Sequence, residues 1–314
     1  MDKSKSLTNG ALLTAIYIVL LLIASFVPII SLVAVFLLPI PFIVFSYRFG
    51  WKQSITMFIA SVILSSLFAT IFSIPVTILM GLGGIMLGSA MRKKLSPYET
   101  MARGTLGFIV GLLCLFSISQ FAFDVNLVEE IDQMTEQSLQ MSKSFMEQLG
   151  LGGQEDQFEL LQQQANMLMD LIPVGVVSLA IILAFISQWF GYKIINRLDK
   201  KQLSFPPFRE LRMPVSLVWV YFFALILTLI GFDPSSIFYH AVNNALVLAG
   251  LLMTVQGFSF IFFYAFQKNK SKALPVICVI VTLLFPFLLL YLVRILGIID
   301  IGFRLRDRIT KDNK

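Results

Sequence analysis

Five polar side chains interrupt otherwise apolar stretches of this 314-residue chain, namely Gln120, Gln188, His240, Asn244 and Gln256. A polar group in apolar surroundings needs a hydrogen-bond partner, so such residues either tie helices together or line a polar site. His240 and Asn244 are four residues apart and share a helix face. Gln256 lies sixteen residues beyond His240, which places it roughly 160° around the same helix. The three do not line one straight face, and interhelical hydrogen bonding is enough to explain each of the five.

The sequence contains no catalytic or metal-binding constellation. A single His excludes a His-Glu-x-x-His zinc site, and neither a Gly-x-Ser-x-Gly elbow nor a Walker motif occurs. Cys114 and Cys278 lie in apolar runs and form no Cys-x-x-Cys pair, so we expect neither a metal site nor a disulfide. Asp300 is the only acid in or near a late apolar run, and Arg304, one turn on, is placed to neutralise it. We therefore expect no enzyme, no metal and no cofactor.

The composition is that of a membrane protein. Apolar residues make up 57% of the chain and charged residues 13%, with a mean hydropathy of +0.85. A soluble domain carries about 25% charged residues. The net charge of +6 is no nucleic-acid footprint, because the bases lie in short loops between apolar runs. We expect a multi-pass protein of the cell (plasma) membrane, with the lipid bilayer as its surroundings and no nucleic-acid partner.

The apolar residues gather in nine segments, and the fold class expected is all-α: a polytopic membrane protein of 8–9 transmembrane helices. The first segment follows Lys3 and Lys5 without a small-x-small cleavage site, so it is expected to be a retained span. The second is short and contains Pro39 and Pro41, which predict a kink or a partly unwound stretch. The nine segments are about 10–29, 31–47, 54–72, 74–91, 104–123, 171–195, 214–232, 240–266 and 274–298.

Two pairs of glycines stand at the small-xxx-small spacing that lets membrane helices approach closely. They are Gly84 with Gly88 in the fourth segment, and Gly107 with Gly111 in the fifth. Neither pair is a phosphate-binding loop, because no strand precedes it and no Lys-Ser/Thr follows. We expect both pairs to serve helix packing.

The stretch 124–170 is a soluble insert between the fifth and sixth segments. It holds ten of the eighteen acidic residues and one base, Lys143, and each carboxylate at the bilayer centre would cost roughly 2.5–3.5 kcal/mol. Apolar residues recur at helical spacing on either side of a glycine-rich break at 149–153. We expect an extracellular helical hairpin whose second arm continues into the next membrane segment. It is either a spacer that packs its Met and Leu stripe on itself or a lid over an outer site. The stripe comprises Leu127, Ile131, Met134, Met141, Phe145 and Leu149, then Phe158, Leu161, Ala165 and Leu168.

The bases predict the orientation. If every segment crosses, the basic loops share one side and only Lys143 falls on the other, so the N-terminus is expected in the cytoplasm. The tail breaks this pattern, because nine crossings would place it outside. We expect a cytoplasmic tail, and three explanations stay open: the last segment turns back near 285–287, an earlier segment does not cross, or the tail is an exception. Eight or nine crossings therefore remain. The tail's bases are Arg304, Arg306, Arg308, Lys311 and Lys314.

These segments divide the chain into four parts. Residues 1–123 form a first membrane bundle of five segments, and 124–170 form the acidic insert. Residues 171–303 form a second bundle, in which segment six completes a six-helix core and two to three helices are added. Residues 304–314 form the basic tail.

Three passages give the chain a family resemblance. They are Leu-Thr-Asn-Gly-Ala-Leu-Leu-Thr-Ala at 7–15, Phe-Pro-Pro-Phe-Arg-Glu-Leu-Arg-Met-Pro at 205–214, and Gln256-Gly257 together with the run 297–306. With the acidic insert, they resemble the YybS-like membrane proteins of Gram-positive bacteria, a family of unknown function. The resemblance covers essentially the whole chain. That family commonly has a second acid where this chain has Arg304.

The first six segments are also similar to the substrate-binding subunits of energy-coupling-factor transporters. Those subunits capture vitamins or similar micronutrients. The resemblance implies that an Ala-x-x-x-Ala motif, here Ala11 and Ala15, packs against a coupling membrane protein driven by ATPases. Two small residues one turn apart make a groove for a partner helix. This chain departs from the pattern by its insert of about fifty residues and three further segments.

Two functions of different classes remain open. The first is a membrane-embedded subunit that binds or transports a small molecule and has no ATPase of its own. The alternative is a scaffold or regulatory membrane protein that holds partners through the insert or the basic loops. The sequence names no ligand, and the proteins that co-purify in mild detergent would separate the two functions.

Overall fold

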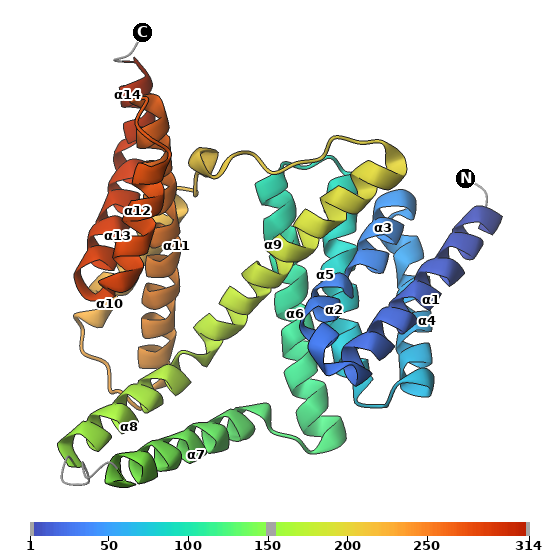
Figure 1. Ribbon diagram of the computed structural model, residues 1–314, viewed down its shortest axis with the longest axis horizontal. Helices are drawn as coiled ribbons and strands as arrows, with labels where there is room; N and C mark the ends of the chain where they lie inside the picture. The colour runs from blue at the N-terminus through green and yellow to red at the C-terminus, as the bar shows by residue number, and fades with distance from the viewer. Residues whose placement is uncertain (1–2, 149–154, 312–314) are drawn as a thin grey trace. The chain divides into compact units, whose positions relative to one another are not determined.

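A computed structural model describes residues 3–148 and 155–311, and within them every regular element is a helix (Figure 1). The chain divides into two compact units, Met1–Phe205 (unit 1) and Pro206–Lys314 (unit 2). In unit 1 the helices are α1 Lys3–Phe26, α2 Pro28–Leu37, α3 Ile40–Phe49, α4 Trp51–Phe68, α5 Ser73–Arg92, α6 Pro97–Phe123, α7 Leu127–Gln148, α8 Glu155–Asp170 and α9 Ile172–Asp199. In unit 2 they are the short 3-10 helix η1 Phe208–Glu210, α10 Ser216–Thr228, α11 Ile237–Gln267, α12 Ala273–Leu284, α13 Pro286–Phe303 and α14 Leu305–Lys311.

Seven described helices are long and apolar enough to cross a membrane: α1, α4, α5, α6, α9, α11 and α13. The expected all-α, polytopic class is therefore confirmed. Six of these helices match expected segments, and the remaining three expected segments are shorter or broken, α13 being part of the last. Pro39 and Pro41 separate α2 from α3, as predicted, and α10 has 13 residues. The last segment breaks at Phe285, because a residue before proline is disfavoured in the helical conformation.

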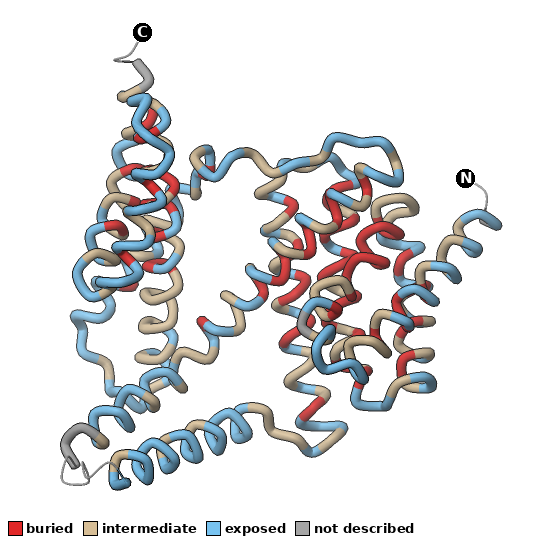
Figure 2. Tube along the Cα trace, viewed as in Figure 1, coloured by how far each residue is buried: buried red, intermediate tan, exposed pale blue. Residues whose placement is uncertain are grey.

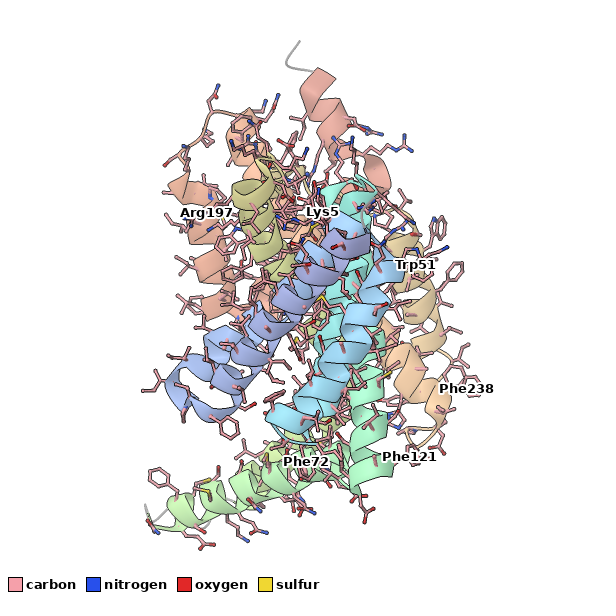
Figure 3. The ribbon with its side chains drawn as sticks, turned by 90° about the vertical axis from the view of Figure 1, so that its right-hand side faces the viewer. Lys5, Trp51, Phe72, Phe121, Arg197 and Phe238 are labelled. Atoms are coloured by element: carbon pink, nitrogen blue, oxygen red, sulfur yellow. The ribbon has the colours of Figure 1, made fainter. Side chains whose placement is uncertain are left out.

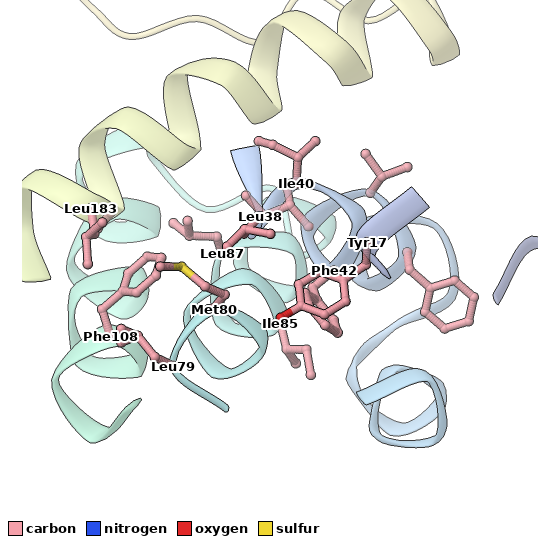
Figure 4. Packing of buried hydrophobic residues seen from close by; sticks show 14 of the residues in the cluster. Tyr17, Leu38, Ile40, Phe42, Leu79, Met80, Ile85, Leu87, Phe108 and Leu183 are labelled. Atoms are coloured by element: carbon pink, nitrogen blue, oxygen red, sulfur yellow. The ribbon is translucent and has the colours of Figure 1, made fainter. Parts of the chain in front are cut away.

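The core of unit 1 forms around α5. Tyr17, Phe42, Leu87 and Phe108 are fully buried there (Figure 4), and the Tyr17 hydroxyl bonds to the Thr77 hydroxyl at 2.8 Å. Lipid tails are as apolar as these side chains, so close packing and dispersion, more than removal from water, hold such a core together.

Local sequence explains where the long helices begin and end. The Ser96 hydroxyl accepts from the Glu99 backbone N–H at 3.3 Å and caps α6. Ser236 caps α11 in the same way, through Tyr239 at 3.2 Å. At its other end α6 stops at Asp124, which adopts the left-handed conformation with φ 56°.

The basic loops of unit 1 gather at one end. Figure 3 shows Lys5, Trp51 and Arg197 at that end, with Phe72 and Phe121 at the other. The Arg48 guanidinium pairs with Asp199 at 2.7 Å, and Arg92 donates to the backbone carbonyls of Tyr47 and Arg48. This end is called the basic end of unit 1. The insert joins α6 to α9 at the opposite end (Figure 1).

The insert forms the two expected helices, α7 and α8, and α8 runs into α9 after a single turn residue, Leu171. The glycine-rich break at 149–153 lies outside the described residues. The expectation that the stripe packs on itself is wrong for much of α7, because Met134, Met141 and Phe145 are 65%, 75% and 62% exposed. Figure 2 shows both helices almost free of buried residues, and the insert therefore presents an apolar face to its surroundings.

In unit 2, α11 and α13 run parallel and in close contact. Gln256 on α11 bonds to Asp300 on α13, and Gly297 faces Met253 and Gly257. A methyl group at Gly297 would lie 2.9 Å from the Gly257 nitrogen and would overlap the Met253 carbonyl. Two parallel neighbours require an antiparallel connection, and α12 supplies it. The chain thus turns back at Phe285, the first of the three explanations left open for the basic tail.

Candidate functional site

A buried polar cluster closes one end of unit 2. The Gln256 amide donates to Asp300 Oδ2 at 2.6 Å, and Arg306 Nε donates to the same oxygen at 2.8 Å. These three residues are only 1%, 4% and 2% exposed. Arg306 also donates to Ser259 Oγ at 3.1 Å. Gln256, Ser259, Asp300 and Arg306 are called the Asp300 cluster.

The Asp300 cluster joins four elements of unit 2. Arg306 lies on α14 and donates to the Arg209 carbonyl of η1 at 2.7 Å. Ser259 on α11 donates to the Phe208 carbonyl at 2.8 Å, and the Gln256 carbonyl oxygen accepts from the Met213 backbone N–H at 3.0 Å. Hydrogen bonds to α11 therefore hold both the η1 region at the start of unit 2 and α14 near its end. A buried pair with this many hydrogen bonds is strongly destabilised when one partner is removed, because the other charge is left unpaired.

The expected pairing of Asp300 with Arg304 is wrong. Arg304 ends α13 in the left-handed conformation, φ 50°, and its side chain is exposed. The i,i+4 rule applies only while the helix continues, so the turn at Arg304 removes its side chain from Asp300. The same turn folds α14 back and carries Arg306 onto the carboxylate.

A cavity of about 290 Å³ opens beside the Asp300 cluster. Arg212 and Asp307 form a half-exposed ion pair at 3.0 Å on its rim. The guanidinium and carboxylate groups suit a small polar solute, with one more base than acid. The lining residues are Arg212, Met213, Val215, Gln256, Asp300, Ile301, Arg304, Arg306 and Asp307.

The five predicted polar residues do not converge. Gln256 belongs to the Asp300 cluster, whereas the Asn244 amide donates to the His240 carbonyl of its own helix at 2.8 Å. In unit 1, Gln188 is buried and donates to the Pro97 carbonyl at 2.8 Å and to the Tyr192 hydroxyl at 2.7 Å, which ties α9 to α6. Gln120 is exposed near the end of α6. Helix-to-helix bonding thus describes Gln188 and Gln256, and Gln256 also borders a cavity.

The predicted glycine pairs lie at internal contacts of unit 1. A methyl group on Gly84 would lie 2.7 Å from the Pro39 carbonyl oxygen, and one on Gly88 would overlap the Ile43 carbonyl of α3. On α6, a methyl on Gly107 would lie 2.8 Å from Met86 Cγ, and one on Gly111 would lie 2.7 Å from Leu79 Cα. Each glycine therefore admits a neighbour that a larger residue would displace.

Ala11 and Ala15 line an open apolar groove of about 770 Å³ between α1 and α4. Both alanines are exposed. The opposite wall belongs to α4 and includes Met57, Ala60 and Leu64. This surface, called the α1–α4 groove, is the feature of unit 1 best shaped to receive another apolar element.

Arg294 was not singled out from the sequence, although a base inside an apolar segment is visible there. Arg294 lies in the middle of α13, inside the last apolar segment, and a base at that depth is by default a functional candidate. Its Nε is buried and has no hydrogen-bond partner among the described residues. Arg306 was missed for another reason, because its role depends on the turn after α13.

Comparison with known proteins gives a family match over most of the chain. Residues 15–301 match a family model described as a predicted membrane protein (DUF2232). The uncharacterized protein YybS of Bacillus subtilis (strain 168) is 29% identical over 310 residues, which cover 98% of this chain and 100% of that protein. No solved structure matches the chain. The comparisons therefore do not show the resemblance to energy-coupling-factor subunits.

Proposed function

Starting from the premise that the chain belongs to the DUF2232 family of predicted membrane proteins, we propose that it is a non-enzymatic subunit of a membrane complex. Its α1–α4 groove receives a transmembrane helix of a partner protein. The observation that carries this proposal is the exposure of Ala11 and Ala15 in an apolar groove on a helix long enough to span the membrane.

A helix suits the α1–α4 groove for physical reasons. Small residues one turn apart let a second helix approach closely, so that its backbone gains dispersion contacts and weak Cα–H hydrogen bonds. The walls of the groove are mainly apolar, with Met57, Ala60 and Leu64 facing the alanines. A partner segment that lies in the membrane therefore loses no hydrogen bonds to water when it enters.

The finer role that we propose is small-molecule binding or transport, with a coupling membrane protein and its ATPases as the partners. The position of the alanine pair on the first membrane helix supports it. The cavity beside the Asp300 cluster supplies a polar compartment large enough for a small solute. The scaffold role is the alternative, and the exposed apolar stripe of α7 favours it, because such a face suits contact with another surface.

The test replaces Ala11 and Ala15 together by Leu, which fills the groove without adding polarity. In native electrophoresis of mildly solubilised membranes, the parent is expected to migrate as a large complex and the double variant at the size of the free subunit. A matched control carries Ala102→Leu and Ala122→Leu, two exposed alanines on α6, and keeps the complex.

The outcomes separate the roles. ATPase subunits in the parent complex support the transport role, whereas structural membrane proteins alone support the scaffold. If the Ala11→Leu/Ala15→Leu variant is stable and keeps every partner, the groove is no interface and the proposal fails. If only that variant is degraded while the α6 control survives, the groove serves packing within the chain.

A further inference from the structure

Arg294 carries a charge at the middle of the apolar helix α13. It is the ninth residue of the 18-residue α13, one of the helices long and apolar enough to cross a membrane. About 12 Å of helix lies on either side of it. Arginines near helix ends extend their side chains to the polar interface, but a central position and a buried Nε leave little reach for that.

The described residues supply no counter-ion for Arg294. The acid in the apolar spans of unit 2 is Asp300, whose Oδ2 already accepts from Gln256 and Arg306. No described ion pair includes Arg294, and its buried Nε donates to no described acceptor. A cation left unpaired at this depth is costly, so a counter-ion from outside the chain would lower its free energy.

The surroundings of Arg294 are shaped to its guanidinium. A methyl group at Gly250 on α11 would lie 2.9 Å from Arg294 Cζ, so the guanidinium lies directly against α11 at a residue without a side chain. The ring centroid of Tyr221 on α10 is 6.0 Å from the same carbon, at the limit of a cation–π contact. The guanidinium thus lies among three helices, and its buried Nε–H has no described acceptor.

We propose that Arg294, with Gly250 and Tyr221, forms a membrane-embedded binding site for an oxyanion, the phosphate or carboxylate group of an anionic ligand. Guanidinium presents donors in a fixed fork that matches two oxygens of such a group. Gly250 allows the approach, and Tyr221 covers one face. This site lies in unit 2 and the α1–α4 groove in unit 1, so neither proposal rests on the other.

Two sources can supply this anion, the phosphate of a bilayer lipid and a free oxyanion, and the test distinguishes them. The protein is freed of lipid in a neutral detergent, and its melting temperature is measured with added phosphatidylglycerol, phosphatidylcholine, sodium phosphate or sodium chloride. Stabilisation by phosphatidylglycerol but not phosphatidylcholine identifies the lipid. Stabilisation by phosphate above that by chloride identifies the free anion.

The decisive variant is Arg294→Met, which keeps an unbranched apolar stem and removes the charge. A structural arginine would make this variant melt lower, whereas an uncompensated one makes it melt higher than the parent when no anion is present. We also expect the apparent affinity for the stabilising anion to fall by roughly ten- to hundredfold. Arg294→Lys keeps the charge without the fork and retains part of the response. Arg308→Met, which removes an exposed base of the tail, responds as the parent does.

Three results overturn the proposal. The parent gains no stability from either anion, or Arg294→Met keeps the full response, or Arg294→Met melts lower than the parent without anion. Failure of that variant to fold counts with the last, since removing an unpaired charge must not unfold the protein. None of these results bears on the α1–α4 groove.

Discussion

The buried pair of Asp300 and Arg306 shows what a single residue contributes in this protein. The carboxylate and the guanidinium are each almost fully buried, so removing one of them leaves the other as an unpaired buried charge. The Gln256 amide donates to the same carboxylate oxygen at 2.6 Å, so a neutral donor adds a second hydrogen bond to the one from the guanidinium. Replacing one of the two residues is therefore expected to lower the stability more than replacing both by apolar residues.

The first prediction concerns Arg306→Met. We expect it to lower the stability of unit 2 by about 3–5 kcal/mol, because Asp300 is left buried and ionised. Adding Asp300→Leu should recover a large part of that loss. The measurement is thermal unfolding in detergent. Arg304→Met, two residues away and exposed, is the control and should change the melting temperature little. Equal losses for Arg304→Met and Arg306→Met would contradict the assignment.

At this scale the sequence was informative for some residues and misleading for others. Gln256 and Asp300 stood out as polar groups in apolar runs, and both lie in the Asp300 cluster. The partner of Asp300 could not be found by spacing, because the left-handed turn at Arg304 decides which arginine folds back. Arg294 needed no structure to be noticed, only the rule that intramembrane charges are functional candidates.

Among the elements, the parallel pair α11 and α13 depends on its glycines. Gly257 faces Val293 and Gly297 faces Met253 so closely that a side chain at either position would overlap backbone atoms of the other helix. Without a hydrophobic driving force between helices in lipid, this contact area is what keeps the pair together. The glycine pairs that the sequence singled out lie in unit 1, and those of unit 2 lack the i,i+4 spacing.

The second prediction is that Gly297→Ala separates α11 from α13. We expect a loss of at least about 1–3 kcal/mol, because the methyl group meets backbone that cannot move aside. Gly302→Ala is the matched control on the same helix: no atom outside its immediate backbone lies within 4 Å of the added methyl, and alanine favours the helix. Thermal unfolding and monodispersity in detergent measure both variants. A tolerated Gly297→Ala would show that the two helices do not touch there.

The sequence predicted that the insert forms helices, but it did not predict which way their apolar stripe faces. Helical spacing of apolar residues predicted α7 and α8, and the acidic residues excluded them from lipid. The same pattern could not tell whether the stripe packs inward or faces outward, since an amphipathic helix satisfies either arrangement. The exposed Met134, Met141 and Phe145 decide for the outward face in α7.

At the scale of the whole molecule, the basic residues and the path of the chain can be compared directly. In unit 1 the loops that carry the bases lie at one end, and the insert leaves from the other (Figures 1 and 3). In unit 2, Arg306 bonds to the Arg209 carbonyl, so the tail returns to the end at which η1 begins. Counting apolar segments gave nine, and the structure divides the ninth at Phe285 into two helices, α12 and α13.

The third prediction is that the insert and the tail lie on opposite sides of the membrane, with the tail in the cytoplasm. The positive-inside rule assigns the sides, and the hairpin of α12 and α13 returns the tail to the basic side. In a chain whose Cys114 and Cys278 are replaced by Ala, Ser138→Cys should react with an impermeant thiol reagent in intact cells. Thr8→Cys, exposed on α1, should react only after permeabilisation. Gln154, a second natural labelling position, lies outside the described residues.

A reporter fused after residue 314 tests the other half of the prediction and decides between eight and nine crossings. The chain turns back at Phe285 between α12 and α13, so both ends of this hairpin are expected on the same side of the membrane. A reporter that is active only in the cytoplasm should therefore work at the C-terminus and after Asn269, and fail after Phe232. Activity after Asn269 but not at the C-terminus would mean that the last segment crosses in one pass. That result would also separate Arg306 from the Arg209 carbonyl, and with it remove the hydrogen bonds on which the Asp300 cluster depends.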